Sequence, residues 1–336
     1  MTMLSLTQAI NAGLRQAMED DGKVVLLGED IGTLGGVFRV TDGLKKDFGG
    51  HRVIDTPLAE SAIIGTAIGL AYRGFRPVCE IQFDGFIYPG FDQIVAQAAK
   101  LHMRTQGAVR MPLTIRVPFG GGIGSPEHHS ESPESYFVHT SGLRVVSPAD
   151  PQDAYLLLRQ AIASDDPVLF FEPKRRYHAK GEVDLAAPLS AAPPMGSARV
   201  VAHGTDVTLV TYGPLVKTAL DAATAAAAEG VSLEVIDLRS LSPIDYGPVL
   251  DSVRRTGRLV ITHEAGRTLG LGAEIAATVT ERCFNSLESA PVRVTGFDIP
   301  YPPSKLERHH LPDLDRILDG VDRALGRPNS QTALED

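Results

Sequence analysis

The feature that most constrains the fold is the alternation of short, wholly apolar runs with longer segments of helical periodicity. In the first half of the chain these runs lack the polar alternation of a half-exposed strand. The strand candidates are Val24–Leu27, Val53–Ile54, Val78–Phe83, Leu113–Val117, Val145–Val146 and Val168–Phe171. Apolar strands separated by amphipathic helices are typical of a parallel sheet that helices cover on both faces. The first half is therefore predicted to be an α/β domain.

A stretch rich in Ala, Pro, Gly and Ser interrupts this alternation and is typical of a linker. Beyond it the pattern resumes, with strands expected at Val207–Tyr212, Ser232–Asp237, Arg258–Thr262 and Val292–Gly296 and helices at Leu215–Glu229 and Gly272–Cys283. A chain of 336 residues is also long for a single core. We predict an α/β domain over residues 1–180, a linker over 181–198 and a smaller α/β domain over 199–336, ending in a frayed polar tail, Arg327–Asp336.

The composition excludes several classes of function. A net charge of −9, from 41 acidic and 32 basic residues, argues against a nucleic-acid partner. The two cysteines, Cys79 and Cys283, are far apart and have no metal-binding spacing, so free buried thiols in a reducing compartment are expected. The first 24 residues show helical spacing rather than a signal peptide's apolar block, and no run approaches the roughly 20 apolar residues of a membrane span. These features predict a cytoplasmic protein outside the membrane.

Glycines after the expected strand Arg258–Thr262 suggest a dinucleotide site, but the pattern fits poorly. Ile275 stands where the third glycine of G-x-G-x-x-G belongs, and the gap from the strand to Gly270 is long for a tight phosphate-binding turn. A nucleotide site here is not predicted.

The segment Asp55–Ser61 leads from an expected strand into the apolar helical run Ala62–Tyr72. Thr56 as N-cap and Pro57 at the first helical position would start this helix, placing Glu60 in its first turn. On spacing alone, the favoured interpretation is a carboxylate stabilised by the helix dipole. The alternative is a carboxyl group at a buried interface, where a shared proton suits a hydrogen bond to a heterocycle's ring nitrogen.

Two further segments end strands at the edge where open α/β sheets bind ligands. In Glu80–Phe86, Gln82 and Phe86 are candidates for lining a pocket, although an ordinary strand end with a core aromatic residue explains them equally well. The loop from Phe119 to Tyr136 begins with closely spaced glycines, which permit close backbone approach, and then carries His128 and His129. Adjacent histidines point in different directions, so each is either a solvated loop residue or a proton-transfer group rather than half of a metal site.

The ordered series GEDIG (Gly28–Gly32), DTPLAESAIIG (Asp55–Gly65), EIQF (Glu80–Phe83), FDQI (Phe91–Ile94), HHSESPE (His128–Glu134), FFEPKRRYH (Phe170–His178), VIDLRSLSPID (Val235–Asp245) and DIPYPPSKLE (Asp298–Glu307) resembles the β-subunits of thiamin-diphosphate-dependent 2-oxo acid dehydrogenases. The resemblance covers nearly the whole chain. It implies a transketolase-like fold, with a pyrimidine-binding α/β domain followed by a smaller C-terminal α/β domain.

The resemblance also implies partners and cofactors. Such subunits form α₂β₂ heterotetramers in which thiamin diphosphate lies between subunits. The α-subunit's GDG…N segment holds the diphosphate and Mg²⁺, and no GDG segment occurs in this chain. No metal ligand is therefore assigned here, although a structural K⁺ is a further expectation. The other implied partner is the lipoyl-bearing dihydrolipoyl acyltransferase core, whose small subunit-binding domain would dock on the C-terminal domain, including Asp298–Glu307.

Residue roles follow from the matching positions. Glu60 resembles the glutamate that hydrogen bonds the aminopyrimidine nitrogen and activates the cofactor, while Glu29, Leu58, Gln82 and Phe86 match cofactor-binding positions. Some relatives have Tyr in place of Phe86. His129 matches the histidine that serves the transfer of the acyl group to the lipoyl arm, with His128 the weaker candidate. The helix Ala62–Tyr72, with Gly65 and Gly69, is either a subunit contact or buried in its own domain.

The implied reaction is oxidative decarboxylation of a 2-oxo acid with reductive acylation of a lipoyl group. HHSESPE and FFEPKRRYH resemble branched-chain members, which favours 3-methyl-2-oxobutanoate and related substrates. Pyruvate or acetoin dehydrogenase is the alternative. A non-catalytic α/β binding module, in which Glu60 and His129 serve only the structure, is the alternative from another class.

Overall fold

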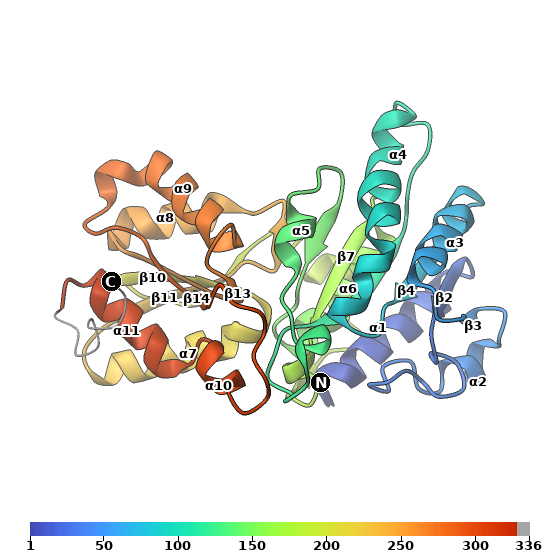
Figure 1. Cartoon of the computed structure of the whole chain (residues 1–336), viewed down its shortest axis with the longest axis horizontal. Helices are drawn as coiled ribbons and strands as arrows, with labels where there is room; N and C mark the ends of the chain where they lie inside the picture. The colour runs from blue at the N-terminus through green and yellow to red at the C-terminus, as the bar shows by residue number, and fades with distance from the viewer. Residues whose placement is uncertain (328–336) are drawn as a thin grey trace.

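The structure, a computed structural model, describes residues 1–327, and the predicted frayed tail lies outside them except for Arg327. Two α/β lobes lie side by side along the long axis, with the N-terminal lobe on the right and the C-terminal lobe on the left (Figure 1). The α-helices are α1 (Leu6–Asp20), α2 (Leu44–Phe48), α3 (Glu60–Tyr72), α4 (Ala99–Arg104), α5 (Glu134–Val138), α6 (Pro151–Ala163), α7 (Val216–Ala228), α8 (Tyr246–Thr256), α9 (Leu271–Cys283), α10 (Glu307–His310) and α11 (Leu314–Ala324).

The N-terminal lobe is built on a seven-stranded sheet in the order β12-β6-β7-β5-β4-β2-β3. All neighbours are parallel except β12, which runs antiparallel to β6. Its strands are β2 (Val24–Gly28), β3 (Val53–Asp55), β4 (Arg76–Glu80), β5 (Thr114–Phe119), β6 (Arg144–Val146), β7 (Val168–Pro173) and β12 (Ser240–Ser242). Helices α1 and α6 pack together over one face, and α3 packs over the other. The predicted covered parallel sheet is confirmed, although the strand expected at Val78–Phe83 ends at Glu80.

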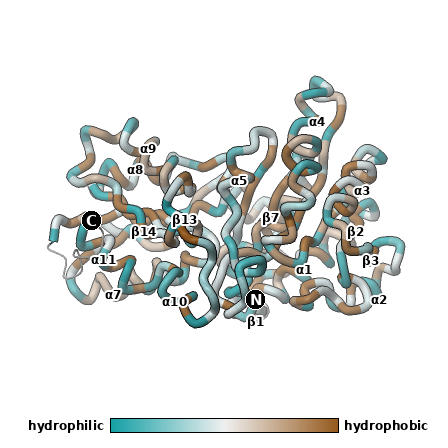
Figure 2. The backbone as a smooth tube through the Cα atoms, viewed as in Figure 1, coloured by the Kyte–Doolittle hydropathy of each residue, from teal (hydrophilic) through white to brown (hydrophobic). Residues whose placement is uncertain are grey.

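The C-terminal lobe contains a five-stranded sheet in the order β14-β13-β10-β11-β9, in which only β9 is antiparallel to its neighbour. Its strands are β9 (Arg199–Ala202), β10 (Val207–Thr211), β11 (Leu233–Asp237), β13 (Leu259–Gly266) and β14 (Val292–Gly296). Helices α7 and α11 cover one face, and α8 and α9 cover the other. Every strand predicted for this half is present. The apolar residues follow the strands in both lobes (Figure 2).

The glycines that suggested a nucleotide site serve helix packing instead. A Cβ atom on Gly270 would lie 2.7 Å from His263 Cε1, and one on Gly272 would lie 2.8 Å from His263 Nε2. The Gly272 N–H also donates to that Nε2 at 3.1 Å. The absence of side chains at these positions lets α9 begin directly against the buried His263 imidazole.

The two lobes are interlocked rather than joined by a free linker. Strand β12 follows β11 in the chain but pairs with β6 of the first sheet. The expected linker also begins with structure, because β8 (Lys180–Val183) pairs antiparallel with β1 (Thr2–Ser5). Val183 and Ala187 pack against buried side chains of α1 and α6. The Ala- and Pro-rich composition was misleading here, because small apolar residues can cover a helix pair without any period of their own.

Other sequence predictions can be compared directly. Both cysteines are free and buried, as expected. Among residues 1–327, no helix is long and apolar enough to cross a membrane.

The contact between the lobes includes a buried carboxyl group. Glu134, at the start of α5, is fully buried, and its Oε1 accepts a hydrogen bond from the Tyr212 hydroxyl beyond β10. Its other oxygen has no partner. Burial raises the pKa of Glu134 to about 7, from 4.5, and the hydrogen bond from Tyr212 opposes only part of this shift. Ionisation of Glu134 is therefore unfavourable in the folded chain.

This raised pKa predicts how stability depends on pH. Because the folded pKa exceeds the unfolded value, the stabilisation is fully present below about pH 4.5 and is lost as pH rises through about 7. Glu134→Gln keeps an acceptor for Tyr212 and cannot ionise. We expect equal stability near pH 4 and a variant more stable by about 1–3 kcal/mol at pH 8. Urea unfolding at both pH values measures this, with the exposed Glu281→Gln as control. Parallel pH curves for wild type and Glu134→Gln would contradict the assignment.

Candidate functional site

The predicted site residues come from the carboxyl ends of neighbouring strands in the first sheet. Glu29 follows β2 directly, Gln82 lies two residues beyond β4, and the loop carrying His129 follows β5. In a parallel sheet these ends meet at one edge, where open α/β folds bind ligands. Five of the six predicted site residues are at least partly buried there, whereas Leu58 is 77% exposed.

Helix α3 begins later than predicted. Thr56 is not its N-cap, because the Thr56 N–H still donates to the Gly28 carbonyl at 2.9 Å as the chain leaves β3. The cap is Ala59, which provides no side-chain acceptor, and Glu60 is the first helical residue. The Glu60 carboxylate is therefore placed where unpaired helix N–H groups favour negative charge. It is also buried, with 8% exposure, so the helix start and a buried position coincide at Glu60.

A second buried carboxyl group accompanies Glu60. Glu29 is 7% exposed, and its Oε1 is buried without a hydrogen-bond partner. Burial raises the pKa of Glu29, and the negative charges of Glu60 and Asp30 raise it further. Asp30 itself has a left-handed backbone, with φ of 56°, of the kind that recurs at functional turns. An acceptor oxygen near Glu60 is thus left without a donor within the folded chain.

Aromatic rings surround the His129 imidazole. Its ring centroid lies 4.2 Å from that of Phe83 and 5.2 Å from that of Phe86, both in edge-on contacts. Its Nδ1 is buried without a partner. Burial lowers the pKa of His129, and the positive charges of Lys174 and His128 lower it further, so the ring is neutral at pH 7. His128 points elsewhere, with a side chain 68% exposed and Nε2 3.8 Å from Glu127. His129 therefore lies among the aromatic rings of Phe83 and Phe86, whereas His128 is exposed.

The cluster consists of the carboxyl pair Glu29 and Glu60, the aromatic residues Phe83 and Phe86 around His129, and Gln82. Gln82 connects the carboxyl pair to the other residues only weakly. Its Nε2 lies 3.4 Å from the Glu29 backbone carbonyl, and its side chain is half-buried. The amide is therefore available for another partner.

Two charged residues that sequence reasoning did not single out lie beneath the cluster. Lys174, in the turn η4 (Lys174–Arg176), forms an ion pair with Asp84 at the start of η1 (Asp84–Gly90), and both side chains are fully buried. Burial raises the pKa of Asp84 to about 6 and lowers that of Lys174, while their mutual attraction offsets part of both shifts. The available signal was a charged residue directly following each of two apolar strand segments, in EIQFD and FFEPK.

The glycine loop is held by the C-terminal lobe. Its N–H groups at Gly122 and Gly124 donate to the Glu307 carboxylate at 2.8 and 3.1 Å, and Gly121 donates to Glu264 at 2.9 Å. The close approach that the glycines permit is thus used by carboxylates of the same chain. Neither Glu264 nor Glu307 was predicted, since both lie more than a hundred residues away in sequence.

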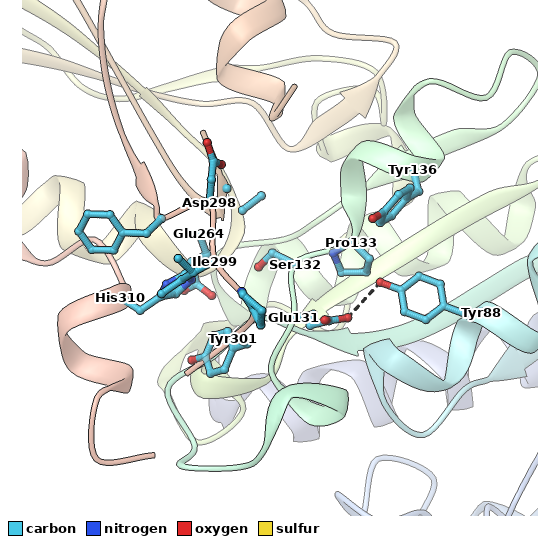
Figure 3. A pocket seen from close by; sticks show the side chains of 14 residues that line it. Tyr88, Glu131, Ser132, Pro133, Tyr136, Glu264, Asp298, Ile299, Tyr301 and His310 are labelled. Carbon is cyan, nitrogen blue, oxygen red and sulfur yellow. Dashed lines mark hydrogen bonds between the residues drawn. The ribbon is translucent and has the colours of Figure 1, made fainter. Parts of the chain in front are cut away.

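A cavity of about 450 Å³ opens between the lobes, beside the glycine loop (Figure 3). Its walls combine aromatic rings with carboxylates and one histidine: Tyr88, Tyr136, Phe297, Tyr301, Glu131, Glu264, Asp298 and His310. The Tyr88 hydroxyl donates to Glu131 at 3.1 Å. This cavity is separate from the Glu60 carboxylate and includes part of the segment Asp298–Glu307.

Comparison with known proteins assigns this arrangement to a family. The family model described as "Transketolase, pyrimidine binding domain" matches residues 2–180, and "Transketolase, C-terminal domain" matches 196–317. The chain is 60% identical to the pyruvate dehydrogenase E1 component subunit beta of Leifsonia xyli subsp. xyli, over 96% of this chain and 95% of the relative. It is 57% identical to the 3-methyl-2-oxobutanoate dehydrogenase subunit beta of Mycobacterium tuberculosis, over 97% and 93%.

The chain belongs to the β-subunits of the thiamin-diphosphate-dependent 2-oxo acid dehydrogenases. Members of this family are enzymes that work with an α-subunit, which excludes the non-catalytic binding module. The transketolase-like two-domain fold is also confirmed. A split-gene transketolase, described as an inactive β4 tetramer, superimposes with a TM-score of 0.79 at 23% identity, over 97% of this chain and 99% of that one.

The carboxyl groups and the aromatic residue of the cluster fit the aminopyrimidine end of thiamin diphosphate. The amino group of that ring needs an acceptor, and Glu29 Oε1 is buried and unpaired. The ring nitrogens need a proton-sharing partner, and Glu60 is a buried carboxyl group beside it. The half-buried Phe86 provides an apolar surface for the ring.

Proposed function

We propose that this chain is the β-subunit of a branched-chain 2-oxo acid dehydrogenase and provides the aminopyrimidine half of a shared thiamin diphosphate site. The observation that carries the proposal is the pair of buried carboxyl groups, Glu29 and Glu60, with an unpaired acceptor oxygen. Glu60 would share a proton with the pyrimidine ring, while Glu29, Leu58, Gln82 and Phe86 would position it. The diphosphate and Mg²⁺ would be bound mainly by the α-subunit. A structural K⁺ would also bind.

The bound cofactor supplies a sink for the negative charge that develops when CO₂ leaves, so the chain's own task is orientation and proton management. Glu60 holds a proton at the ring nitrogen. His129, neutral at pH 7, exchanges a proton through its unpaired Nδ1 as the acyl group passes to a lipoyl arm. Phe83 and Phe86 exclude water around this imidazole.

The partner would cover the exposed side of α3. Ile63, Ile64 and Ala67 of this helix are buried within the lobe, but Gly69 is exposed, and a Cβ atom added to it would meet nothing within 4 Å. Leu58 is exposed just before it. Burial in its own domain therefore accounts for one face of α3, and we propose that the other face contacts a second subunit of an α₂β₂ heterotetramer.

The shared site predicts that cofactor binding requires the α-subunit. Alone, this chain leaves the diphosphate charge uncompensated and the Glu60 pocket open to water. We expect calorimetric titration with thiamin diphosphate and Mg²⁺ to show binding at least 100-fold weaker for the chain alone than for the αβ complex, with thermal stabilisation of the complex only. One-to-one micromolar binding by the isolated chain would exclude a shared site.

Glu60→Gln tests the proton-sharing role. The amide preserves shape and hydrogen bonding but cannot take up and release the proton. We expect normal assembly and a loss of about 10²-fold or more in decarboxylation turnover with saturating cofactor, measured with an artificial electron acceptor. The exposed Glu281→Gln provides a matched control with wild-type turnover. Near-normal turnover in Glu60→Gln would remove Glu60 from the mechanism.

The substrate assignment rests on the motifs HHSESPE and FFEPKRRYH, while the relatives include both pyruvate and branched-chain enzymes. We expect the purified αβ complex to show a kcat/KM at least tenfold higher for 3-methyl-2-oxobutanoate than for pyruvate. A preference for pyruvate would instead favour the second candidate, pyruvate dehydrogenase, which the 60% identical relative supports.

We also propose that the acyltransferase core docks its small binding domain on the C-terminal lobe. The exposed Ile299 and Phe297 lie beside Asp298 at the cavity between the lobes. Apolar side chains rimmed by carboxylates are typical of protein contact sites.

A further inference from the structure

The buried ion pair between Asp84 and Lys174 has no part in the roles proposed above. The Lys174 Nζ lies 2.5 Å from Asp84 Oδ1, and both side chains are 0% exposed. Asp84 follows β4, whereas Lys174 follows β7, so the pair joins two strand ends that are not neighbours in the sheet. Burying two charges is costly and often adds no net stability. The pair therefore calls for an explanation other than stability.

Each member of the pair holds one part of the cofactor and acyl-transfer cluster. The second oxygen of Asp84, Oδ2, accepts the Glu131 N–H at 2.6 Å, two residues after His129. The Lys174 ammonium lies 5.8 Å from the centroid of the Phe83 ring, which contacts His129 on another side. The two charges thus contact both the segment Gln82–Phe86 and the histidine loop.

The backbone packing beneath the cluster has little freedom to adapt. A Cβ atom on Gly85 would lie 2.6 Å from the His128 carbonyl oxygen and 2.9 Å from its Cα. The Gly120 N–H donates to the Glu131 carbonyl at 2.8 Å, closing the base of the histidine loop. A change in the position of Asp84 is therefore transmitted directly to His129.

We propose that Asp84 and Lys174 are positioning residues that join the segment Gln82–Phe86 and the loop carrying His129 into one rigid unit. The catalytic consequence rests on the proposed function, whereas the rigidity can be measured without cofactor. The pair also sets the electrostatics of the site. After burial, Lys174 is the largest influence lowering the pKa of His129; His128 and Glu127 lie on the histidine's own turn, and Asp84 is paired with Lys174.

Asp84→Asn is the first test variant, and Asp84→Asn/Lys174→Met is the second. An amide offers one oxygen to two donors, so either Lys174 or the Glu131 N–H loses its acceptor. The double variant removes both charges, which avoids leaving an unpaired buried ammonium. The control is Asp153→Asn/Arg239→Met, which removes another buried ion pair, with Nη2 2.7 Å from Oδ1, outside the cluster.

Hydrogen exchange of the assembled αβ complex measures rigidity. We expect backbone amides of residues 127–131 to exchange at least tenfold faster in both Asp84 variants than in wild type, and at wild-type rates in the control. Wild-type protection in the Asp84 variants, or equal loosening of this loop in the control, would overturn the proposal.

The pH profile of lipoyl acylation provides the second readout. The double variant lacks the Lys174 charge, so the part of the pH profile that reflects the titration of His129 should move to higher pH. Its turnover should also fall at least tenfold. His129→Ala identifies this part of the profile by lacking it. An unmoved profile with wild-type turnover would refute the positioning role. Failure of the proposed function would be seen separately. Cofactor-dependent turnover would survive Glu60→Gln, while the histidine loop would still exchange faster in the Asp84 variants.

Discussion

The buried triad of Arg116 with Glu80 and Glu172 is the interaction on which the geometry of the site depends. Arg116 Nη1 lies 2.7 Å from Glu80, and its Nε lies 2.6 Å from Glu172, with all three side chains almost inaccessible to water. The residues come from β5, β4 and β7, three adjacent strands of the first sheet. A one-residue slip of any strand would move its charged side chain to the opposite face and leave the others unpaired in a low-dielectric interior. The triad therefore specifies the register of the central strands.

This register determines where the functional loops begin. Gln82 lies two residues beyond Glu80, and Lys174 lies two residues beyond Glu172. Because β4 ends at Glu80 and β7 ends at Pro173, these short offsets place Gln82 and Lys174 just beyond the strand ends. The Asp84–Lys174 pair at the sheet edge therefore follows in sequence from two of the three strands that the triad joins. Tyr177, whose hydroxyl donates to Glu172 at 2.6 Å, links the triad to α1, because its carbonyl accepts the Thr7 N–H.

The sequence predicted the fold and most of the candidate site for identifiable reasons. Apolar strand runs and helical periodicity are local signals, so the α/β class and nearly all of the strands could be read directly. Short contiguous motifs were enough to name the candidate residues Glu29, Glu60, Gln82, Phe86 and His129. The helix start at Glu60 was misplaced because Thr56-Pro57 is a strong local start signal, overridden by the hydrogen bond between Thr56 and Gly28. Strand β12 and the carboxylates Glu264 and Glu307 were missed because they depend on contacts between the lobes, which no local pattern records.

Two buried atoms of the candidate site, on Glu29 and His129, have no hydrogen-bond partner. Interiors rarely leave buried acceptors unsatisfied, because each costs about 1–3 kcal/mol. Yet Glu29 Oε1 and His129 Nδ1 lack partners, while the nearby Asp84, Lys174 and glycine N–H groups are fully paired. Within the cluster, the unpaired groups are thus on Glu29 and His129, and the residues that support them are paired. Unpaired groups above a rigid, hydrogen-bonded support are expected where a ligand binds, because the ligand's hydrogen bonds then offset the desolvation of those groups.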